Sequence, residues 1–330
     1  MKSEVSSDCS SDTIEAIAQC GGFSCRWPQQ AEPYPRGVSV HIYLNGVFLP
    51  ASEAKISVFD GGYMYGDGIY TTLRLYRGLP LDLAAHHSRL RDHSAQMQIP
   101  FAMSCENLRR IIADLVAHNK LDQTDSRLRI TVSRGGDPEN PLPLVALDRP
   151  ETTVVMTLAP VSSKLPDWQK NGIPVICMDG SFARGNFPKL KTLNSLATIT
   201  ALRQAAAAGC PEALLCDAAG HLLEGAVSNI FLVVNGKLHT PLNEGAFLAG
   251  RTRERILGIS IDEKIEVAKL KIHRTDLTKA DEVFVVSSVR EVLPVVSIDG
   301  LPVGNGRPGS VTQQIQTKYR ELIAHELGTA

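Results

Sequence analysis

No apolar stretch of this sequence is long enough to cross a membrane, and neither sign of charge is in clear excess. The longest apolar stretches, such as residues 280–289, contain charged residues and fall far short of the roughly 20 residues that a membrane helix needs. The 34 Lys and Arg nearly cancel the 35 Asp and Glu, so the chain has no net charge with which to attract a polyanion. We therefore expect neither a membrane protein nor a nucleic-acid-binding protein.

The cysteines lack the close paired spacing of a zinc site or of a disulfide framework. Their number, seven, is odd, and this pattern is typical of reduced thiols in a cytoplasmic protein. His86 and His87 have no carboxylate or cysteine at metal spacing, so we expect no metal ion. The seven cysteines are Cys9, Cys20, Cys25, Cys105, Cys177, Cys210 and Cys216.

Residues 1–38 lack the basic start and the apolar centre of a secretory signal. They are rich in Ser, Cys and small polar residues, and Pro28, Pro33 and Pro35 lie near their end. No spacing of apolar residues in this segment is typical of a core-forming helix or strand. We predict a poorly ordered extension without a targeting role.

The rest of the chain is well supplied with apolar residues. At 43% hydrophobic residues in a chain of 330, it can bury a full core, and its length suggests two domains. In the first half, an alternating apolar run meets Asn45-Gly46, the strongest short hairpin signal. Alternation predicts strands at 69–76, 127–132 and 152–158, and helical spacing predicts helices at 83–98 and 105–118. We expect a smaller N-terminal α+β domain over residues 39–159.

Residues 160–166, which hold two prolines, two serines and a lysine, are the predicted linker. Beyond it, predicted strands alternate with predicted helices, which indicates a larger, mixed α/β domain over residues 167–330. The predicted strands are 174–178, 213–216, 229–234 and 282–286, and the predicted helices are 195–208, 252–260 and 312–327.

Lys191 stands just ahead of the predicted helix at 195–208. An ammonium group beside helix N-terminal amides and away from water is destabilised, which favours the neutral amine that attacks carbonyl compounds. On position alone, however, a solvated surface lysine is the simpler interpretation. The segments around Lys191 and elsewhere in the chain decide between the two.

Six segments resemble, in order and spacing, the signature of the class IV aminotransferases. In the second half they are Lys191-Thr-Leu-Asn194, Glu224-Gly225 with Ser228-Asn229-Ile-Phe, Leu248-Ala-Gly250-Arg-Thr252, and Asp281-Glu-Val-Phe with Ser287-Ser288. In the first half they are the glycine turn Asp60-Gly-Gly-Tyr63-Met-Tyr65-Gly-Asp-Gly68 and His86-His-Ser-Arg89-Leu. The resemblance covers about residues 41–320 and implies a two-domain enzyme of fold type IV with pyridoxal 5'-phosphate (PLP) as cofactor.

The resemblance also implies a role for individual residues. Lys191 would carry the cofactor, and Glu224 would pair with the pyridine nitrogen so that the ring can withdraw electrons. Arg89, a helix start and a strand end would supply donors to the cofactor phosphate. The implied cofactor-binding residues are Arg89, Lys191, Glu224, Ser228, Asn229, Arg251, Thr252, Ser287 and Ser288.

Other residues are candidates for binding the substrate. Tyr63 matches a position that lines the substrate pocket in relatives, and Arg129 matches a substrate-side arginine of some members. Arg127 and Arg129 alternate on one strand and share a face, either as a solvated pair or as a carboxylate-binding pair. Thr71 is the fourth candidate, whereas we interpret Tyr70 as a core aromatic.

Two activities stay open. The favoured one is an aminotransferase that moves an amino group between an amino acid, of branched-chain or D-amino acid type, and a 2-oxo acid. The resemblance further implies a homodimer. The alternative is a 4-amino-4-deoxychorismate lyase that releases pyruvate and p-aminobenzoate, because Thr71-Thr72 stands where many transaminases of the family have a glutamate. Both enzymes would use Lys191 and Glu224.

Overall fold

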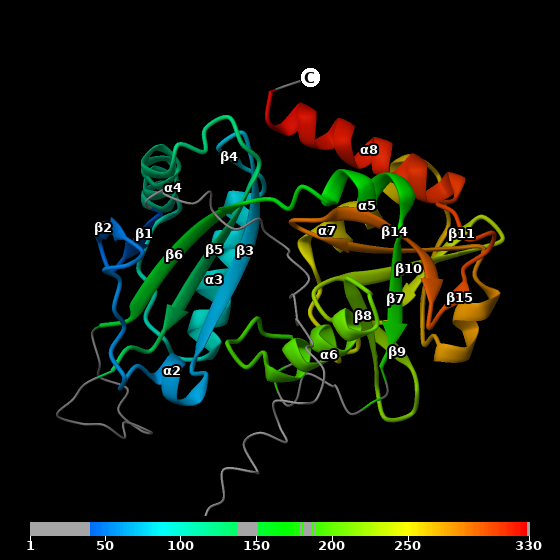
Figure 1. Ribbon diagram of the computed structural model, residues 1–330, viewed down its shortest axis with the longest axis horizontal. Coiled ribbons are helices and arrows are strands. Elements are labelled where there is room, and N and C mark those ends of the chain that lie inside the picture. Colours follow the sequence, from blue (N-terminus) through cyan, green and yellow to red (C-terminus); the bar gives the residue numbers. More distant parts are fainter. Residues whose placement is uncertain (1–39, 137–150, 179, 181–186, 188, 329–330) are drawn as a thin grey trace, which may run out of the picture.

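The computed structural model describes residues 40–136, 151–178, 180, 187 and 189–328. The predicted extension at residues 1–38 lies outside this range, so that expectation stays a prediction. The described chain forms two β-sheets, each with its own helices (Figure 1). Among the described helices, none combines the length and the apolarity that a membrane span requires.

The first sheet is antiparallel throughout, with six strands in the order β2-β1-β6-β5-β3-β4. Its first hairpin turns at Asn45 and Gly46, whose φ angles of 46° and 97° confirm the turn that this dipeptide predicts. The strands are β1 (His41–Leu44), β2 (Val47–Pro50), β3 (Gly68–Tyr76), β4 (Leu79–Pro80), β5 (Ser126–Ser133) and β6 (Thr153–Pro160).

Helices α3 (Leu83–Gln96) and α4 (Cys105–Asn119) pack on one face of this sheet, as predicted for an α+β unit. The apolar residues of α4 at helical spacing, such as Leu108 and Leu115, are buried against Leu73 and its neighbours in the sheet. The short helix α2 (Gly61–Tyr65) lies within the glycine turn between β2 and β3. The opposite face of β3 and β5 is left for the second half of the chain.

The second sheet has nine strands in the order β12-β11-β10-β13-β14-β7-β8-β9, with β15 paired to β14. The pairs β11–β12, β14–β7 and β7–β8 are parallel and the others antiparallel, which confirms the predicted mixed α/β fold. The strands are β7 (Ile173–Cys177), β8 (Glu212–Cys216), β9 (Leu222–Gly225), β10 (Asn229–Val234), β11 (Lys237–Pro241), β12 (Val267–Leu270), β13 (Glu282–Ser287), β14 (Glu291–Ile298) and β15 (Leu301–Pro302).

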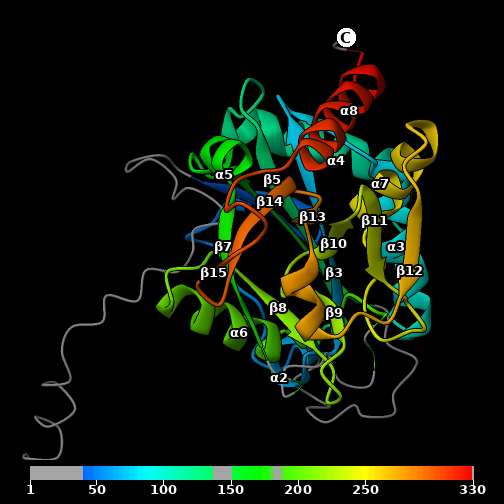
Figure 2. The ribbon, with the colours of Figure 1, turned by 90° about the vertical axis from the view of Figure 1, so that its right-hand side faces the viewer.

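Within the described residues, four α-helices and a short 3₁₀ helix accompany this sheet. Figures 1 and 2 both place α8 at the top of the molecule and α6 at the bottom. The helices are α5 (Leu165–Asn171), α6 (Leu196–Ala207), α7 (Arg251–Asp262), η2 (Arg274–Lys279) and α8 (Ser310–Glu326).

The chain passes from the first sheet to the second through a short connection. Strand β6 ends at Pro160 and α5 begins at Leu165, so regular structure enters the predicted linker 160–166 from both sides. The core of the first sheet contains only residues up to Leu158, whereas the next core cluster begins at Leu165. A third cluster joins Leu81 of the first half to residues of the second half. On the two larger clusters we propose the division into domains of residues 39–159 and 167–330.

Candidate active site

A cavity of about 530 Å³ lies between the two sheets. Its walls come from β3, β5 and α3 in the first half, and from α6, β9, β10, α7 and the end of β13 in the second. The cavity brings together every predicted site residue except Tyr63. Its lining thus includes Thr71, Arg89, Arg127, Arg129, Lys191, Glu224, Ser228, Asn229, Arg251, Thr252, Ser287 and Ser288.

Tyr63 does not lie with the other candidates. It is on α2, its residue is 76% exposed, and it is not among the described residues that line the cavity. The single chain therefore gives Tyr63 no contact with this site, and its role in substrate binding stays a prediction.

Lys191 is held against the first sheet although the helix that follows it belongs to the second half. The amide of Tyr70 donates to the Lys191 carbonyl (2.9 Å), and the amide of Leu193 donates to the Gly68 carbonyl (2.9 Å). These bonds add a short antiparallel pairing to the start of β3. The backbone amide of Lys191 also donates to His93 Nδ1 (3.2 Å).

The glycine turn makes this approach sterically feasible. A Cβ on Gly66 would lie 2.3 Å from Asn194 Oδ1, and one on Gly68 would lie 2.6 Å from the Leu193 side chain. Gly66 also has a φ of 68°, a conformation that side chains disfavour. The glycines that the sequence marks as a turn therefore let the lysine segment lie against β3.

The start of α7 faces the cavity and is fixed from two sides. Asn229 Oδ1 accepts from the amide of Gly250, the N-cap (2.9 Å), and Asn229 Nδ2 donates to the Leu248 carbonyl (3.0 Å). From α3, Arg89 Nη2 donates to the Ala249 carbonyl (2.9 Å). The first amides of a helix have no partner within it, so this start can bind an anion. Burial is the main cause that lowers the pKa of Arg89.

Ser228 belongs to a buried ionic cluster beside the cavity. Its hydroxyl donates to Glu212 Oε2 (3.0 Å), and the same oxygen lies 3.1 Å from Nη1 of Arg290. The side chains of Glu212 and Arg290 are 0% and 5% exposed. The sequence patterns do not identify this pair as part of the site, because nothing in the spacing of residues 212 and 290 indicates that they meet.

Glu224 provides the negative charge of the cavity. It lies in β9, opposite Leu215 of β8, and its residue is only 3% exposed. A carboxylate buried to this degree requires a hydrogen-bonding or charged neighbour. Its place in the cavity wall is consistent with a carboxylate that meets a cationic group of a ligand.

Arg127 and Arg129 extend from the cavity face of β5, as their alternation predicts. The Arg129 guanidinium stacks on the ring of Tyr70, with 3.7 Å between the guanidinium carbon and the ring centroid. Burial lowers the pKa of both arginines, and for Arg127 the charge of Arg129 acts in the same direction. The interpretation of Tyr70 as a core aromatic was wrong, because this half-buried residue lines the cavity.

Thr71 and His86 form a hydrogen-bonded pair at the edge of the cavity. Thr71 Oγ1 and His86 Nδ1 are 2.7 Å apart, and both residues are buried. Burial, followed by the charge of Arg89, lowers the pKa of His86 to about 3. His86 is therefore neutral near pH 7.

The charges of the cavity fit PLP, which combines a phosphate with a pyridine ring and a carbonyl group. Six cationic side chains, those of Arg89, Arg127, Arg129, Lys191, Arg251 and Arg290, line the same cavity as Glu224, and of these Arg290 is paired with the buried Glu212. The buried Nε of Arg251 has no hydrogen-bond partner among the described residues, as expected of a donor that an added anion would satisfy. Within the same residues, no group of His, Cys, Asp and Glu could hold a metal ion.

Comparison with known proteins gives a consistent result. The family model for class IV amino-transferases matches residues 68–298. A putative branched-chain-amino-acid aminotransferase of Methanocaldococcus jannaschii is 33% identical, over 85% of this chain and 96% of the relative. A D-alanine aminotransferase of Bacillus licheniformis is 30% identical, over 86% of this chain and 98% of the relative.

The fold is also similar to solved structures. The branched-chain amino acid aminotransferase of Escherichia coli matches with a TM-score of 0.78 and 28% identity, over 86% of this chain and 95% of that structure. Another branched-chain amino acid aminotransferase, complexed with N-(5'-phosphopyridoxyl)-L-glutamate, matches with a TM-score of 0.76, also at 28% identity. The chain therefore belongs to the class IV amino-transferase family and is a PLP-dependent aminotransferase.

Proposed function

We propose that the enzyme transfers the amino group of a branched-chain or D-amino acid to a 2-oxo acid, with Lys191 as the residue that binds PLP covalently. The support for the substrate class is the names of the relatives, one a putative branched-chain enzyme and others D-alanine enzymes. The observation that carries the assignment of the site is the convergence of the predicted cofactor residues on one cavity.

When bound, the cofactor supplies a carbonyl group for the substrate amine and a ring that withdraws electrons. Glu224 would hold the ring nitrogen protonated from the wall at β9. Arg89, the start of α7 at Arg251 and Thr252, and Ser287 with Ser288 would bind the phosphate through charge and fixed donors. Lys191, once the substrate amine has replaced it, would be free to move protons as a base.

Arg127 and Arg129 would bind the carboxylate of the substrate. They are on the cavity face of β5, neither forms an ion pair with a carboxylate of the described residues, and Tyr70 holds Arg129 in place by stacking. Two arginines present planar donors that match a carboxylate. A dicarboxylic 2-oxo acid, with one carboxylate at each end, suits this excess of positive charge.

The test is to incubate the purified enzyme with L-valine, L-leucine, L-isoleucine and D-alanine, each with 2-oxoglutarate or pyruvate, and to measure the new amino acid. Transfer from at least one of these donors is the expected result. A parallel incubation with 4-amino-4-deoxychorismate measures pyruvate and p-aminobenzoate. Pyruvate release there, without amino transfer in the panel, would contradict the proposal and favour the lyase.

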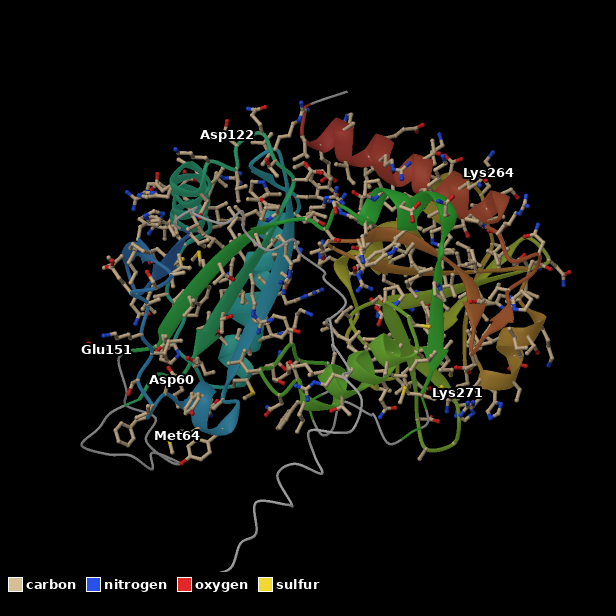
Figure 3. The ribbon with its side chains drawn as sticks, viewed as in Figure 1. Asp60, Met64, Asp122, Glu151, Lys264 and Lys271 are labelled. Carbon is tan, nitrogen blue, oxygen red and sulfur yellow. The ribbon has the colours of Figure 1, made fainter. Side chains whose placement is uncertain are left out.

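We also propose that the enzyme is a homodimer in the cytoplasm. Residues 56–65 carry several exposed apolar side chains, a feature that monomers rarely keep together. Figure 3 shows Met64 on α2 at the outer edge of the first half. Free cysteines, among them Cys177 and Cys216 with sulfurs 3.6 Å apart, suit a reducing compartment. The exposed apolar residues are Ile56, Val58, Tyr63, Met64 and Tyr65.

A further inference from the structure

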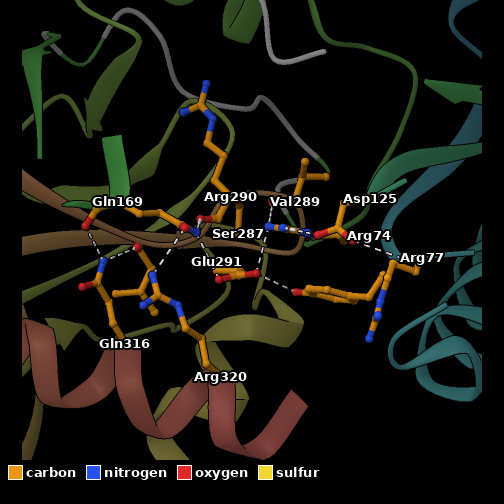
Figure 4. Close-up of polar contacts among 12 residues, drawn as sticks. Arg74, Arg77, Asp125, Gln169, Ser287, Val289, Arg290, Glu291, Gln316 and Arg320 are labelled. Atoms are coloured by element: carbon orange, nitrogen blue, oxygen red, sulfur yellow. Dashed lines mark hydrogen bonds and ion pairs between the residues drawn. The ribbon is translucent and has the colours of Figure 1, made fainter. Parts of the chain in front are cut away.

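The turn between β13 and β14, residues 287–291, has two sides with different neighbours. Ser287, Ser288 and Arg290 line the cavity. On the other side, Glu291 and the carbonyl of Val289 meet side chains of the first sheet. Figure 4 shows these contacts around the turn. The turn is therefore the place where the proposed phosphate-binding serines are connected to the other half of the molecule.

Glu291 is the centre of these contacts. Its carboxylate lies 2.8 Å from Arg74 Nη1 and accepts from the Tyr76 hydroxyl (2.9 Å) and from Gln169 Nε2 (3.0 Å). The Glu291 side chain is 7% exposed and that of Arg74 is 11% exposed. An ion pair removed from water in this way is held firmly only where further hydrogen bonds support it, and here those bonds reach the Glu291 carboxylate and both terminal nitrogens of Arg74.

Arg74 holds the turn at a second point. Its Nη1 also donates to the Val289 carbonyl (3.1 Å), while Nη2 donates to Asp125 Oδ2 (2.7 Å), a residue of the first half. One guanidinium thus binds both the turn and its own sheet. Burial alone would lower the pKa of Arg74, but Glu291, Tyr76 and Asp125 together raise it, so it stays charged.

The backbone of Glu291 is in an unfavourable conformation. Its φ is 59°, in the left-handed region that a non-glycine residue rarely occupies. Such a conformation persists where the surrounding contacts determine it. The bonds from Arg74, Tyr76 and Gln169 are those contacts.

Arg74 also connects the turn to the substrate side of the cavity. It lies two residues after Thr72 on the same face of β3, and in the sheet it stands opposite Arg127 while Thr72 stands opposite Arg129. A shift of the turn against β3 would change the distance between the serines and the arginine pair. The contacts of Arg74 therefore set the distance between the two serines of the turn and the pair Arg127 and Arg129.

We propose that Glu291 and Arg74 are positioning residues, which hold the 287–291 turn so that Ser287 and Ser288 meet the phosphate of PLP at a fixed distance from Arg127 and Arg129. The inference rests on the proposed function, because it assigns the two serines to the phosphate. Neither positioning residue is required to touch the cofactor.

The test measures how fast PLP leaves the holoenzyme of Glu291→Gln, by following the absorbance of bound cofactor during repeated dilution and ultrafiltration. Glutamine keeps the shape but loses the charge that Arg74 needs. We expect PLP to leave at least about tenfold faster, equal to a barrier to release that is lower by about 1.4 kcal/mol. The ³¹P resonance of bound PLP should also shift, whereas borohydride should still attach the cofactor to Lys191.

Glu282→Gln is the matched control. Glu282 begins β13, the strand that leads to the turn, and its carboxylate also accepts three bonds, from the Val311 amide and from the amide and hydroxyl of Thr312. This variant should lose thermal stability without a faster release of PLP. Equal acceleration in both variants, or release from Glu291→Gln within twofold of the wild-type rate, would overturn the inference.

Two milder variants keep the test decisive if Glu291→Gln does not fold. Arg74→Lys keeps the positive charge, but a lysine cannot bind the Val289 carbonyl and Glu291 in the same planar geometry. Tyr76→Phe removes the hydroxyl that donates to the Glu291 carboxylate. Both should release PLP faster than the wild type, and wild-type rates in both would refute the inference.

Ser288→Ala separates the inference from the proposed function on which it rests. If this variant releases PLP at the wild-type rate, the assignment of the Ser288 hydroxyl to the phosphate is wrong. If Ser288→Ala releases PLP faster while Glu291→Gln does not, the positioning role of Glu291 and Arg74 is refuted and the proposed function is not affected.

Discussion

The guanidinium carbon of Arg129 lies 3.7 Å from the centroid of the Tyr70 ring, and Nζ of Lys191 lies 4.6 Å from the same centroid. One aromatic side chain of β3 thus contacts both the lysine proposed to bind the cofactor and an arginine proposed to bind the substrate. Cations are attracted to the face of such a ring, and the attraction increases where water is excluded. The ring therefore helps to set the distance between the two ends of a bound substrate.

Replacement of Arg129 by Ala should raise KM for 2-oxoglutarate by roughly tenfold or more, because a charged hydrogen bond to a carboxylate is lost. The absorbance of bound PLP should not change, since the proposed cofactor contacts of Arg89 and Glu224 remain. Steady-state kinetics with saturating amino donor measure the effect. Arg109→Ala, on the exposed side of α4, is the control. An unchanged KM in Arg129→Ala and in Arg127→Ala would exclude both arginines as the carboxylate site.

Borohydride reduction of the holoenzyme should attach the cofactor to Lys191. Only this lysine lines the described cavity, whereas Lys189, two residues earlier, is exposed. Mass spectrometry of the digested protein locates the adduct. Lys191→Ala should therefore yield no adduct and no transfer, and Lys189→Ala should behave as the wild type. An adduct on Lys189 would refute the central assignment.

The Glu224→Gln enzyme should still bind PLP at Lys191 but turn over slower by several powers of ten. A neutral amide cannot keep the ring nitrogen protonated, and each tenfold loss corresponds to about 1.4 kcal/mol of transition-state stabilisation. The absorbance of bound cofactor and kcat, measured on the same sample, separate binding from chemistry. Near-normal kcat would remove this carboxylate from the mechanism.

Acid should destabilise the protein through His86. Its pKa is lowered to about 3 in the folded protein and is near 6.5 when unfolded, so the unfolded chain binds more protons between these values. Stability should therefore fall as the pH drops from 6.5 toward 3, and this contribution should be constant above pH 6.5. Guanidinium unfolding measures the free energy of unfolding at pH 7 and at pH 5. The decrease in this free energy between the two pH values should be up to about 2 kcal/mol smaller in His86→Asn than in the wild type. Equal losses in the two proteins would contradict the prediction.

The sequence predicted the elements whose patterns are long and regular. The alternation in β3, β5 and β6 and the helical spacing in α4 identified them within a few residues. The strands β4, β12 and β15 were not predicted, because each has four residues or fewer and too short a pattern to show alternation. In β14, Pro294 and the left-handed Glu291 interrupt the usual strand signal.

For the candidate site, the motifs identified the residues on the cofactor side but not those that support them. Glu212 and Arg290 form an ion pair although they are 78 residues apart in the sequence, and Tyr76 and Glu291 form a hydrogen bond although they are 215 residues apart. No local sequence pattern could therefore indicate either pair. Tyr70 was assigned to the core because an aromatic in a strand beside a glycine turn usually packs there. Its cavity contact depends on Arg129 and Lys191, which come from other segments.

The pairing of Thr192 with Ile69 has a consequence for the order of folding. These residues are more than a hundred positions apart, and closing so long a loop is entropically costly, so such contacts form late. The first sheet is completed only when β6 pairs with β5, after which the segment at Lys191 can dock on β3. We therefore expect the chain to acquire PLP at the end of folding rather than to fold around it.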